Sequence, residues 1–354
     1  MLYSKLGSTG LIVSRLALGT MSFGMGSGNP AIARTREGEA DALVGRAIDA
    51  GINFFDTADV YAGGESETML GRAMGQRRDE VVVATKAGWR TGDPLNRSGL
   101  SAAHLLWSIG QSLKRLGTDH VDVYIAHRED AHTPLQETLQ ALDTIVKHGK
   151  ARYLGVSNWA PWKIAAAIEL QRANGWAQFT HVQSMYSLLG REVEHQMLPL
   201  AAHYGLGFTA WSPLAGGFLS GKYTRDNLKD ADNRLSGFDM IPFDKEHGFA
   251  LVEQMRAIAA DHDASVAQVA LAWLLARPQV SSVLVGASRM SQLEDNLAAA
   301  DVELSPDQIA ALDAATDSKP DFTVGVSRVP DTPIVNALAA RPGERPTLTA
   351  EAVV

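Results

Sequence analysis

The sequence of 354 residues contains no cysteine. This absence excludes disulfide bonds, a catalytic thiol, an iron–sulfur cluster and any zinc site with cysteine ligands. Any chemistry that the protein performs must therefore depend on oxygen and nitrogen groups.

Positive charge is also scarce, because 32 Lys and Arg face 40 Asp and Glu and give a formal net charge of −8. Nucleic acids and anionic membranes bind clustered positive surface, so we expect neither as the main partner. No run approaches the roughly 18 apolar residues of a membrane span. Arg15 interrupts the first apolar stretch, which is not typical of a signal peptide. We expect a cytoplasmic protein, monomer or homo-oligomer, whose partner is a small molecule.

Short apolar runs, typical of strands buried on both faces, alternate along the chain with longer segments of helical periodicity. The length allows two ordinary domains or one large α/β barrel. The expected strands are 15–19, 53–56, 81–86, 121–127, 153–156, 181–183, 207–210 and 282–285. No composition break or linker divides them, so we expect a single (β/α)8 TIM barrel, with a doubly wound parallel sheet as the alternative.

Local signals bound some of these elements. Ser101 is a suitable N-cap for a helix that Gly117 would end. The turn at 8–10 lies between two apolar runs and predicts an N-terminal β-hairpin, which could cap the bottom of the barrel. We divide the chain into a barrel domain, 1–318, and a proline-rich tail, 319–354, in which no pattern predicts order.

Four polar residues end or follow three neighbouring expected strands. Asp56 ends NFFD, Tyr61 follows five residues later, Lys86 ends VVVATK and His127 ends DVYIAH. Because active sites of such barrels form at the C-terminal ends of the strands, we expect these side chains to lie together. Each alone is as easily a cap, a salt bridge or a structural histidine. Their joint placement favours a proton-donating site that faces a carbonyl group.

The chemistry of these four side chains is coherent. An ammonium at Lys86 would lower the pKa of a nearby Tyr61, and Asp56 would serve as the counter-ion of that ammonium. A histidine at position 127 could hydrogen-bond a substrate oxygen and fix its direction.

Two other enzyme classes are less well supported. No G-x-G-x-x-G segment follows a strand and opens a helix, so a Rossmann dehydrogenase is not favoured. A metal-dependent hydrolase would need clustered ligands, and the HREDAH segment at 127–132 lacks the helical histidine pair that such sites use. We expect no metal site.

The chain carries, in this order, DTADVY, the lysine after VVVAT, the histidine of IAHRED, GVSN, the Gln183 segment and GASRMSQLEDNL. Taken together, these motifs resemble the aldo-keto reductase family. The resemblance extends from about Leu6 to Ala315. The segment SPLAGGFLSGKY resembles the branch that includes the potassium-channel β-subunits.

The resemblance implies NADPH-dependent reduction of an aldehyde or ketone to an alcohol by hydride transfer. Tyr61 matches the general acid of the family. Lys86 and Asp56 match the residues that tune this acid, and His127 matches the residue that orients the carbonyl.

The resemblance also assigns residues to the cofactor, NADP(H). These are Gly19, Thr20, Met21, Ser157, Asn158, Gln183, Trp211, Ser212, Leu214, Gly216, Ser220, Lys222, Arg234, Gly286, Ser288, Arg289, Gln292, Asp295 and Asn296. Ser157, Asn158 and Gln183 match positions that hold the carboxamide, whose donors and acceptor they can satisfy without charge. Trp211 matches the aromatic residue that stacks on the nicotinamide. Arg289, just before a helix, suits a phosphate and favours NADP(H) over NAD(H).

The substrate pocket is expected to include Phe23, Trp89 and Tyr186, with the loops 89–100 and 224–247 around it. These loops are long and irregular, and their sequences do not indicate which ligand they bind.

A different class of function is also open. The protein could be a nicotinamide-binding regulatory subunit that senses redox state and turns over slowly. The complete set of four site residues favours the enzyme, because a binding module has no need of an acid positioned by a Lys–Asp pair.

Overall fold

A computed structural model describes residues 1–25, 29–228, 230, 234–320 and 324–325. Most of the predicted tail, 319–354, lies outside the described residues. Within the described ranges, no helix is both long enough and apolar enough to cross a membrane.

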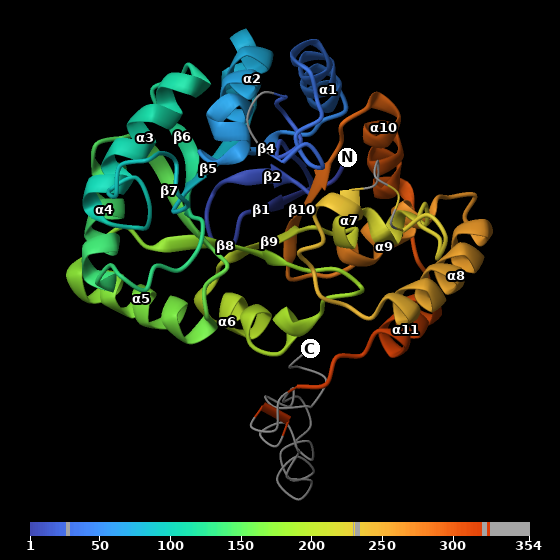
Figure 1. The fold of residues 1–354 in the computed structure, drawn as a ribbon. Helices are drawn as coiled ribbons and strands as arrows, with labels where there is room; N and C mark the ends of the chain where they lie inside the picture. The colour runs from blue at the N-terminus through green and yellow to red at the C-terminus, as the bar shows by residue number, and fades with distance from the viewer. Residues whose placement is uncertain (26–28, 229, 231–233, 321–323, 326–354) are drawn as a thin grey trace, which may run out of the picture.

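Eight parallel strands form a closed barrel in the order β10-β3-β4-β5-β6-β7-β8-β9 (Figure 1). They are β3 (Leu16–Gly19), β4 (Phe54–Asp56), β5 (Val82–Ala87), β6 (Val121–Ala126), β7 (Ala151–Ser157), β8 (Phe179–Met185), β9 (Gly207–Trp211) and β10 (Val280–Gly286). Every predicted strand is present, with ends within two residues of those predicted. Closure of the sheet confirms the TIM barrel and excludes the doubly wound alternative.

Helices surround the strands (Figure 1). The α-helices are α1 (Glu37–Asp49), α2 (Glu65–Met74), α3 (Ala102–Leu116), α4 (Leu135–Lys147), α5 (Pro161–Asn174), α6 (Met197–Tyr204), α7 (Arg234–Gly237), α8 (Lys245–Asp261), α9 (Val266–Leu275), α10 (Met290–Ala298) and α11 (Pro306–Ala315). Short 3₁₀ helices are η1 (Tyr61–Gly64), η2 (Gly75–Glu80), η3 (Glu192–Glu194), η4 (Ala215–Ser220) and η5 (Ala299–Asp301). Ser101 caps α3 by accepting the His104 N–H at 3.3 Å, and Gly117 ends it in the left-handed conformation, both as predicted.

The predicted N-terminal hairpin pairs β1 (Tyr3–Lys5) with β2 (Ile12–Ser14) in antiparallel register. It lies at the bottom of the barrel, against the first residues of β9 and β10. Leu6 and Val13 are fully buried and pack with the apolar side chains of the barrel interior. The hairpin therefore closes the end of the barrel opposite to the end where the strands finish.

The barrel interior changes from apolar to polar along the strands. His181 lies midway, with its ring 6.3 Å from that of Phe54 and its Nε2 atom 2.7 Å from the hydroxyl of Thr209. Gly155 makes room for this ring, since a Cβ atom there would come within 2.9 Å of both His181 Nδ1 and Ile125 Cγ1. Above this level the interior carries charged side chains, at the C-terminal ends of the strands.

Candidate active site

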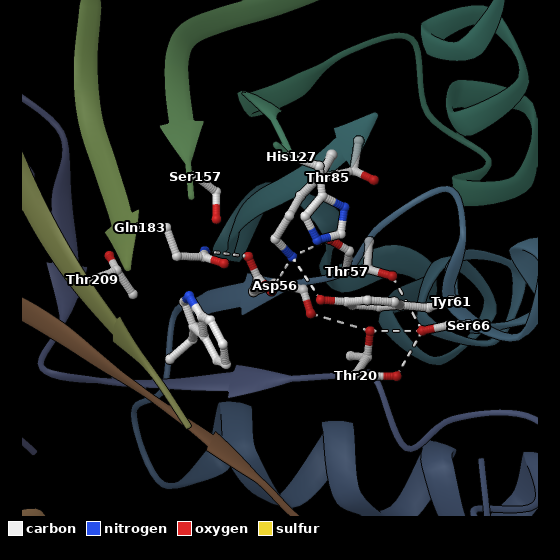
Figure 2. Close-up of polar contacts among 12 residues, drawn as sticks. Thr20, Asp56, Thr57, Tyr61, Ser66, Thr85, His127, Ser157, Gln183 and Thr209 are labelled. Atoms are coloured by element: carbon white, nitrogen blue, oxygen red, sulfur yellow. Dashed lines mark hydrogen bonds and ion pairs between the residues drawn. The ribbon is translucent and has the colours of Figure 1, made fainter. Parts of the chain in front are cut away.

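The four side chains singled out in the sequence meet at the C-terminal end of the barrel. Figure 2 shows three of them, Asp56, Tyr61 and His127, and Lys86 bonds to the first two. Asp56 ends β4, Tyr61 opens η1, Lys86 lies near the end of β5, and His127 follows β6. Lys86 Nζ donates to Asp56 Oδ1 at 2.5 Å, to the Thr57 carbonyl oxygen at 2.7 Å and to Tyr61 Oη at 3.2 Å. The Tyr61 and His127 rings meet edge to face with centroids 5.9 Å apart. The geometry joins all four residues into one cluster.

Lys86 is fully buried beneath the Tyr61 hydroxyl. Burial by itself lowers the pKa of Lys86, but the neighbouring Asp56 and Tyr61 outweigh it, and the pKa is raised. The lysine therefore keeps its proton. Asp56 is held from its other side as well, because Gln183 Nε2 donates to Oδ2 at 2.8 Å.

Tyr61 differs from the expectation in one respect. Burial raises the pKa of its hydroxyl, and Lys86 offsets this only in part, so the net shift is upward. The predicted effect of Lys86 is present, since its charge lowers the pKa of Tyr61, but burial, which the sequence does not show, outweighs it. The consequence is a tyrosine that holds its proton at neutral pH and can donate it.

His127 is a neutral imidazole in this environment. Burial lowers its pKa well below 6.5, and the positive charges of Lys86 and Arg128 lower it further. A neutral imidazole carries one N–H donor and no charge. His127 can therefore hydrogen-bond a carbonyl oxygen without competing with Tyr61 as the acid.

A cavity of about 1520 Å³ opens above these side chains. Asp56, Tyr61 and His127 line it, as does Trp89, whereas Lys86 lies beneath its floor. Its wall also contains the whole cofactor set named from the sequence except Thr20. The structure thus gathers residues from all eight strand ends around one space.

Three predicted residues do not reach the cavity. Thr20 is fully buried, with its hydroxyl 2.8 Å from Ser66 Oγ, because strand alternation turns it outward behind the barrel wall. Phe23 is fully buried in the hydrophobic core. Tyr186 is also fully buried and donates its hydroxyl to Glu194 at 2.6 Å. Their predicted roles in cofactor or substrate contact were wrong, since each faces packing partners of the protein itself.

The residues expected to hold a carboxamide are linked to one another. Asn158 adopts a left-handed conformation with φ 57°. Its Nδ2 donates to the His127 carbonyl at 3.1 Å and to Ser157 Oγ at 3.0 Å, and its Oδ1 accepts from Trp211 Nε1 at 3.2 Å. The amide nitrogen of Gln183 already donates to Asp56. The Oε1 atom of Gln183 therefore is the one that can accept from an N–H of a ligand.

The other end of the cavity is basic. Burial lowers the pKa of Lys222, and the positive charges of Arg234, Arg289 and Arg34 lower it further. The Nε atom of Arg234 is closed off from solvent and has no hydrogen-bond partner among the described residues. Such a cluster of cations favours a bound anion, with phosphate groups as the natural match.

The strand-to-helix segments at this end suit close approach of a ligand. Gly216 and Gly217 in η4 have positive φ of 69° and 93°. A Cβ atom at Gly286 would meet no protein atom within 4 Å.

Asp295 already forms hydrogen bonds within the protein, since its two carboxylate oxygens accept from Ser265 and Gln268. Asp295 thus supports the start of α9 as well as lining the cavity.

Sequence reasoning missed part of the wall. Arg34, Arg36 and Arg128 line the cavity. The apolar residues of the 235–241 segment line it too, and they lie within the loop 224–247 that the sequence places around the pocket. That segment lies against residues 29–31, because Asn29 Nδ2 donates to the Gly237 carbonyl at 2.9 Å. A signal for Arg128 was present, since it directly follows His127. The others come from loops whose path the sequence does not determine.

No group of three or more His, Asp or Glu side chains in the described ranges is arranged to hold a metal ion. The polar groups that converge on the cavity are instead acids, amides, hydroxyls and cations.

Comparisons with known proteins agree with this arrangement. The sequence matches the family described as "Aldo/keto reductase family" over residues 15–317. A probable voltage-gated potassium channel subunit beta from Oryza sativa subsp. japonica is 39% identical over 337 residues, which is 91% of this chain and 99% of the relative. The uncharacterized oxidoreductase YrpG from Bacillus subtilis (strain 168) is 37% identical over 321 residues, or 88% of this chain and 94% of the relative. Versiconal hemiacetal acetate reductase from Aspergillus parasiticus is 33% identical over 334 residues, with coverage of 88% and 96%. The chain belongs to the aldo/keto reductase family.

Proposed function

We propose that the protein reduces an aldehyde or ketone to the corresponding alcohol, with NADPH as the hydride donor and Tyr61 as the general acid. The observation that carries this proposal is the buried ion pair of Lys86 and Asp56, with Lys86 Nζ 3.2 Å from Tyr61 Oη at the base of a large cavity. The family supports the same class of reaction, as do the oxidoreductase and reductase names of two relatives.

The roles of the residues follow from their charges. Tyr61 carries a proton at neutral pH and would transfer it to the substrate oxygen. The Lys86 ammonium would stabilise the phenolate charge that this transfer leaves behind, and Asp56 keeps the ammonium protonated in its buried position. His127, as a neutral donor, would hold the oxygen against Tyr61.

The cavity fits a phosphorylated nicotinamide nucleotide, which when bound supplies the hydride. Trp211 would offer its aromatic face to the nicotinamide ring, with Ser157 beside it. Lys222 and Arg234 would bind phosphate groups, which supplies a partner for the Arg234 Nε atom. Arg289, immediately before α10, is the cation placed for an additional phosphate, and this supports NADP(H) over NAD(H).

The alternative of a regulatory subunit has one observation in its favour. Two plant relatives named as probable voltage-gated potassium channel subunit beta are 39% and 36% identical to this chain. In that case the same cavity would bind the nucleotide and sense its redox state, while turnover would be slow.

One experiment separates the two functions. NADPH oxidation is followed with a panel of aldehydes and ketones for the wild type and Y61F, and NADPH binding is measured by fluorescence. We expect steady turnover by the wild type, a loss of about 10²–10⁴-fold in Y61F, and equal NADPH binding by both.

The control is Y204F, which removes a tyrosine hydroxyl from α6, outside the cavity, and should keep full turnover. Full reductase activity in Y61F would overturn the proposal. Tight NADPH binding with negligible turnover of every carbonyl would favour the regulatory subunit instead.

A further inference from the structure

Arg128 is held beside the candidate site in a fixed position. Its guanidinium lies 4.0 Å from the centroid of the Trp89 ring, and its Nε donates to the Gly88 carbonyl at 3.4 Å. The edge-to-face contact of Trp89 with His127, at 6.2 Å, joins the stacked pair to the group that would orient the carbonyl. Trp89 is 42% exposed, and both it and Arg128 line the cavity.

The position of Arg128 separates it from the cations assigned to the cofactor. Lys222 follows β9 and Arg289 follows β10, whereas Arg128 follows β6. In the strand order of the barrel, β6 lies opposite β10. A nucleotide whose phosphate groups lie at Lys222 and Arg289 therefore leaves Arg128 on the far side of the cavity, where the substrate must enter.

Among the described residues, no carboxylate forms an ion pair with Arg128. The acids in the cavity wall are engaged elsewhere. Asp56 pairs with Lys86, Asp295 accepts from Ser265 and Gln268, and Glu39 accepts the backbone N–H of Arg36.

Stacking also prepares the guanidinium for a particular ligand. A ring that covers one face of a guanidinium leaves the N–H groups along the guanidinium edge available. The spacing of these N–H groups matches that of the two oxygens of a carboxylate. Because Trp89 holds the side chain in place, less conformational entropy is lost on binding than for a free arginine.

We propose that Arg128 binds a carboxylate of the substrate, so that the preferred substrates are carbonyl compounds with an acidic group at the end distant from the reacting carbonyl. This inference rests on the proposed reductase function and names the substrate class of the same site. With the carbonyl oxygen at Tyr61 and His127, the carboxylate of such a compound extends along Trp89 toward Arg128.

The test compares two aldehydes that share a benzaldehyde core, para-carboxybenzaldehyde, which is an anion at neutral pH, and methyl para-formylbenzoate, its uncharged ester. The quantity measured is the ratio of their kcat/KM values with NADPH. In R128Q we expect this ratio to fall by about tenfold or more, chiefly through KM for the acid, because a hydrogen bond between charged groups is lost with the acid alone. R128K, which keeps the charge but loses the planar fork, should give an intermediate ratio.

The chain offers a matched control. Arg97 lies 4.0 Å over the ring of Trp107, in the same stacked arrangement, but neither residue lines the cavity. R97Q should keep the wild-type ratio. Added salt should lower the ratio in the wild type and leave it unchanged in R128Q.

The outcomes distinguish the two proposals. If both aldehydes are reduced and R128Q shows the wild-type ratio, the role of Arg128 is overturned while the reductase function stands. If the wild type reduces neither these aldehydes nor any other carbonyl with NADPH, the function itself fails and the substrate class fails with it.

Discussion

Lys86 Nζ lies 2.5 Å from Asp56 Oδ1, and the two side chains are 0% and 3% exposed. Water therefore does little to stabilise either charge, and the Lys86 ammonium depends on the Asp56 carboxylate to remain protonated. The pair fixes a positive charge directly below the Tyr61 hydroxyl. A buried lysine without its carboxylate would instead lose its proton to desolvation.

Breaking this pair should affect stability and turnover together. D56N leaves Lys86 buried without a counter-ion, so folding must either bury an unpaired ammonium or remove its proton. We therefore expect the free energy of unfolding to fall by about 3–5 kcal/mol, and K86M should destabilise by a similar amount. Both variants should lose carbonyl reduction. Urea unfolding and NADPH turnover measure the two effects.

The double variant D56N/K86M is the control for this prediction, because it removes both charges. It should recover a large part of the lost stability and remain inactive, which separates the chemical role from folding. Single variants that each cost less than about 1 kcal/mol, the value of an exposed pair, would contradict a buried and mutually dependent ion pair.

Much of the fold could be predicted because local signals coincide with the final structure. Strands covered on both faces form continuous apolar runs, which is why their ends were placed to within two residues. Ser101 and Gly117 bound α3 through their own backbone and side-chain chemistry, whatever the tertiary context. Closure of the barrel is a long-range property, and only the uniform alternation indicated it.

The site was predictable where function depends on strand ends and unpredictable where it depends on side-chain direction. Asp56 and Lys86 belong to strands whose C-terminal ends must meet. Phe23 and Tyr186 lie in loop segments after strands, and only the packed structure shows that their rings turn into the core. The direction of the Tyr61 pKa shift depends on burial, which composition and spacing do not determine.

Gly7 should be essential for the hairpin that closes the barrel. It has φ +63°, and a Cβ atom there would collide with the backbone of Gly207 at the start of β9. Backbone cannot move aside as a flexible side chain can, so G7A should destabilise the protein by about 2 kcal/mol or more in thermal or urea unfolding. Because the hairpin lies at the far end from the site, kcat of the folded protein should not change.

Gly10 in the same turn provides the comparison. A Cβ atom there would meet nothing within 4 Å, and its φ is not positive. G10A should stay within about 0.5 kcal/mol of the wild type. Equal destabilisation by the two substitutions would mean that the loss of glycine, rather than the contact with β9, is responsible.

Arg289 should distinguish the two nicotinamide nucleotides. If it binds the additional phosphate of NADPH, R289Q should raise KM for NADPH about tenfold or more and have little effect on KM for NADH, because one charged hydrogen-bonding partner is lost only with NADPH. K222Q, which removes a cation from the shared phosphate region, should weaken both nucleotides. Equal changes for NADPH and NADH in R289Q would contradict this assignment and the preference for NADP(H).

Behind the site lies a buried carboxyl group that the reaction does not use. Asp59 is 3% exposed, its Oδ2 accepts from Ser108 at 2.7 Å, and its Oδ1 has no partner among the described residues. Burial and the nearby Glu67 carboxylate raise the pKa of Asp59 to about 7, against the opposing effects of Ser108, Arg115 and Lys86.

This shift should make the stability of the protein depend on pH. Between the ordinary pKa of about 3.9 and the folded value of about 7, the unfolded chain has released the Asp59 proton while the folded chain keeps it. The free energy of unfolding contributed by Asp59 therefore falls as the pH rises through this range, by at most about 1.4 kcal/mol per pH unit, and is constant above it.

The variant D59N tests this dependence. Its residue 59 cannot ionise, so its stability relative to the wild type should rise from about pH 5 to pH 7 and then level off. Urea unfolding across this range measures the difference, and D301N, at an exposed aspartate outside the cluster, is the matched control. A D59N difference that is the same at every pH would show that Asp59 is ionised in the folded protein throughout.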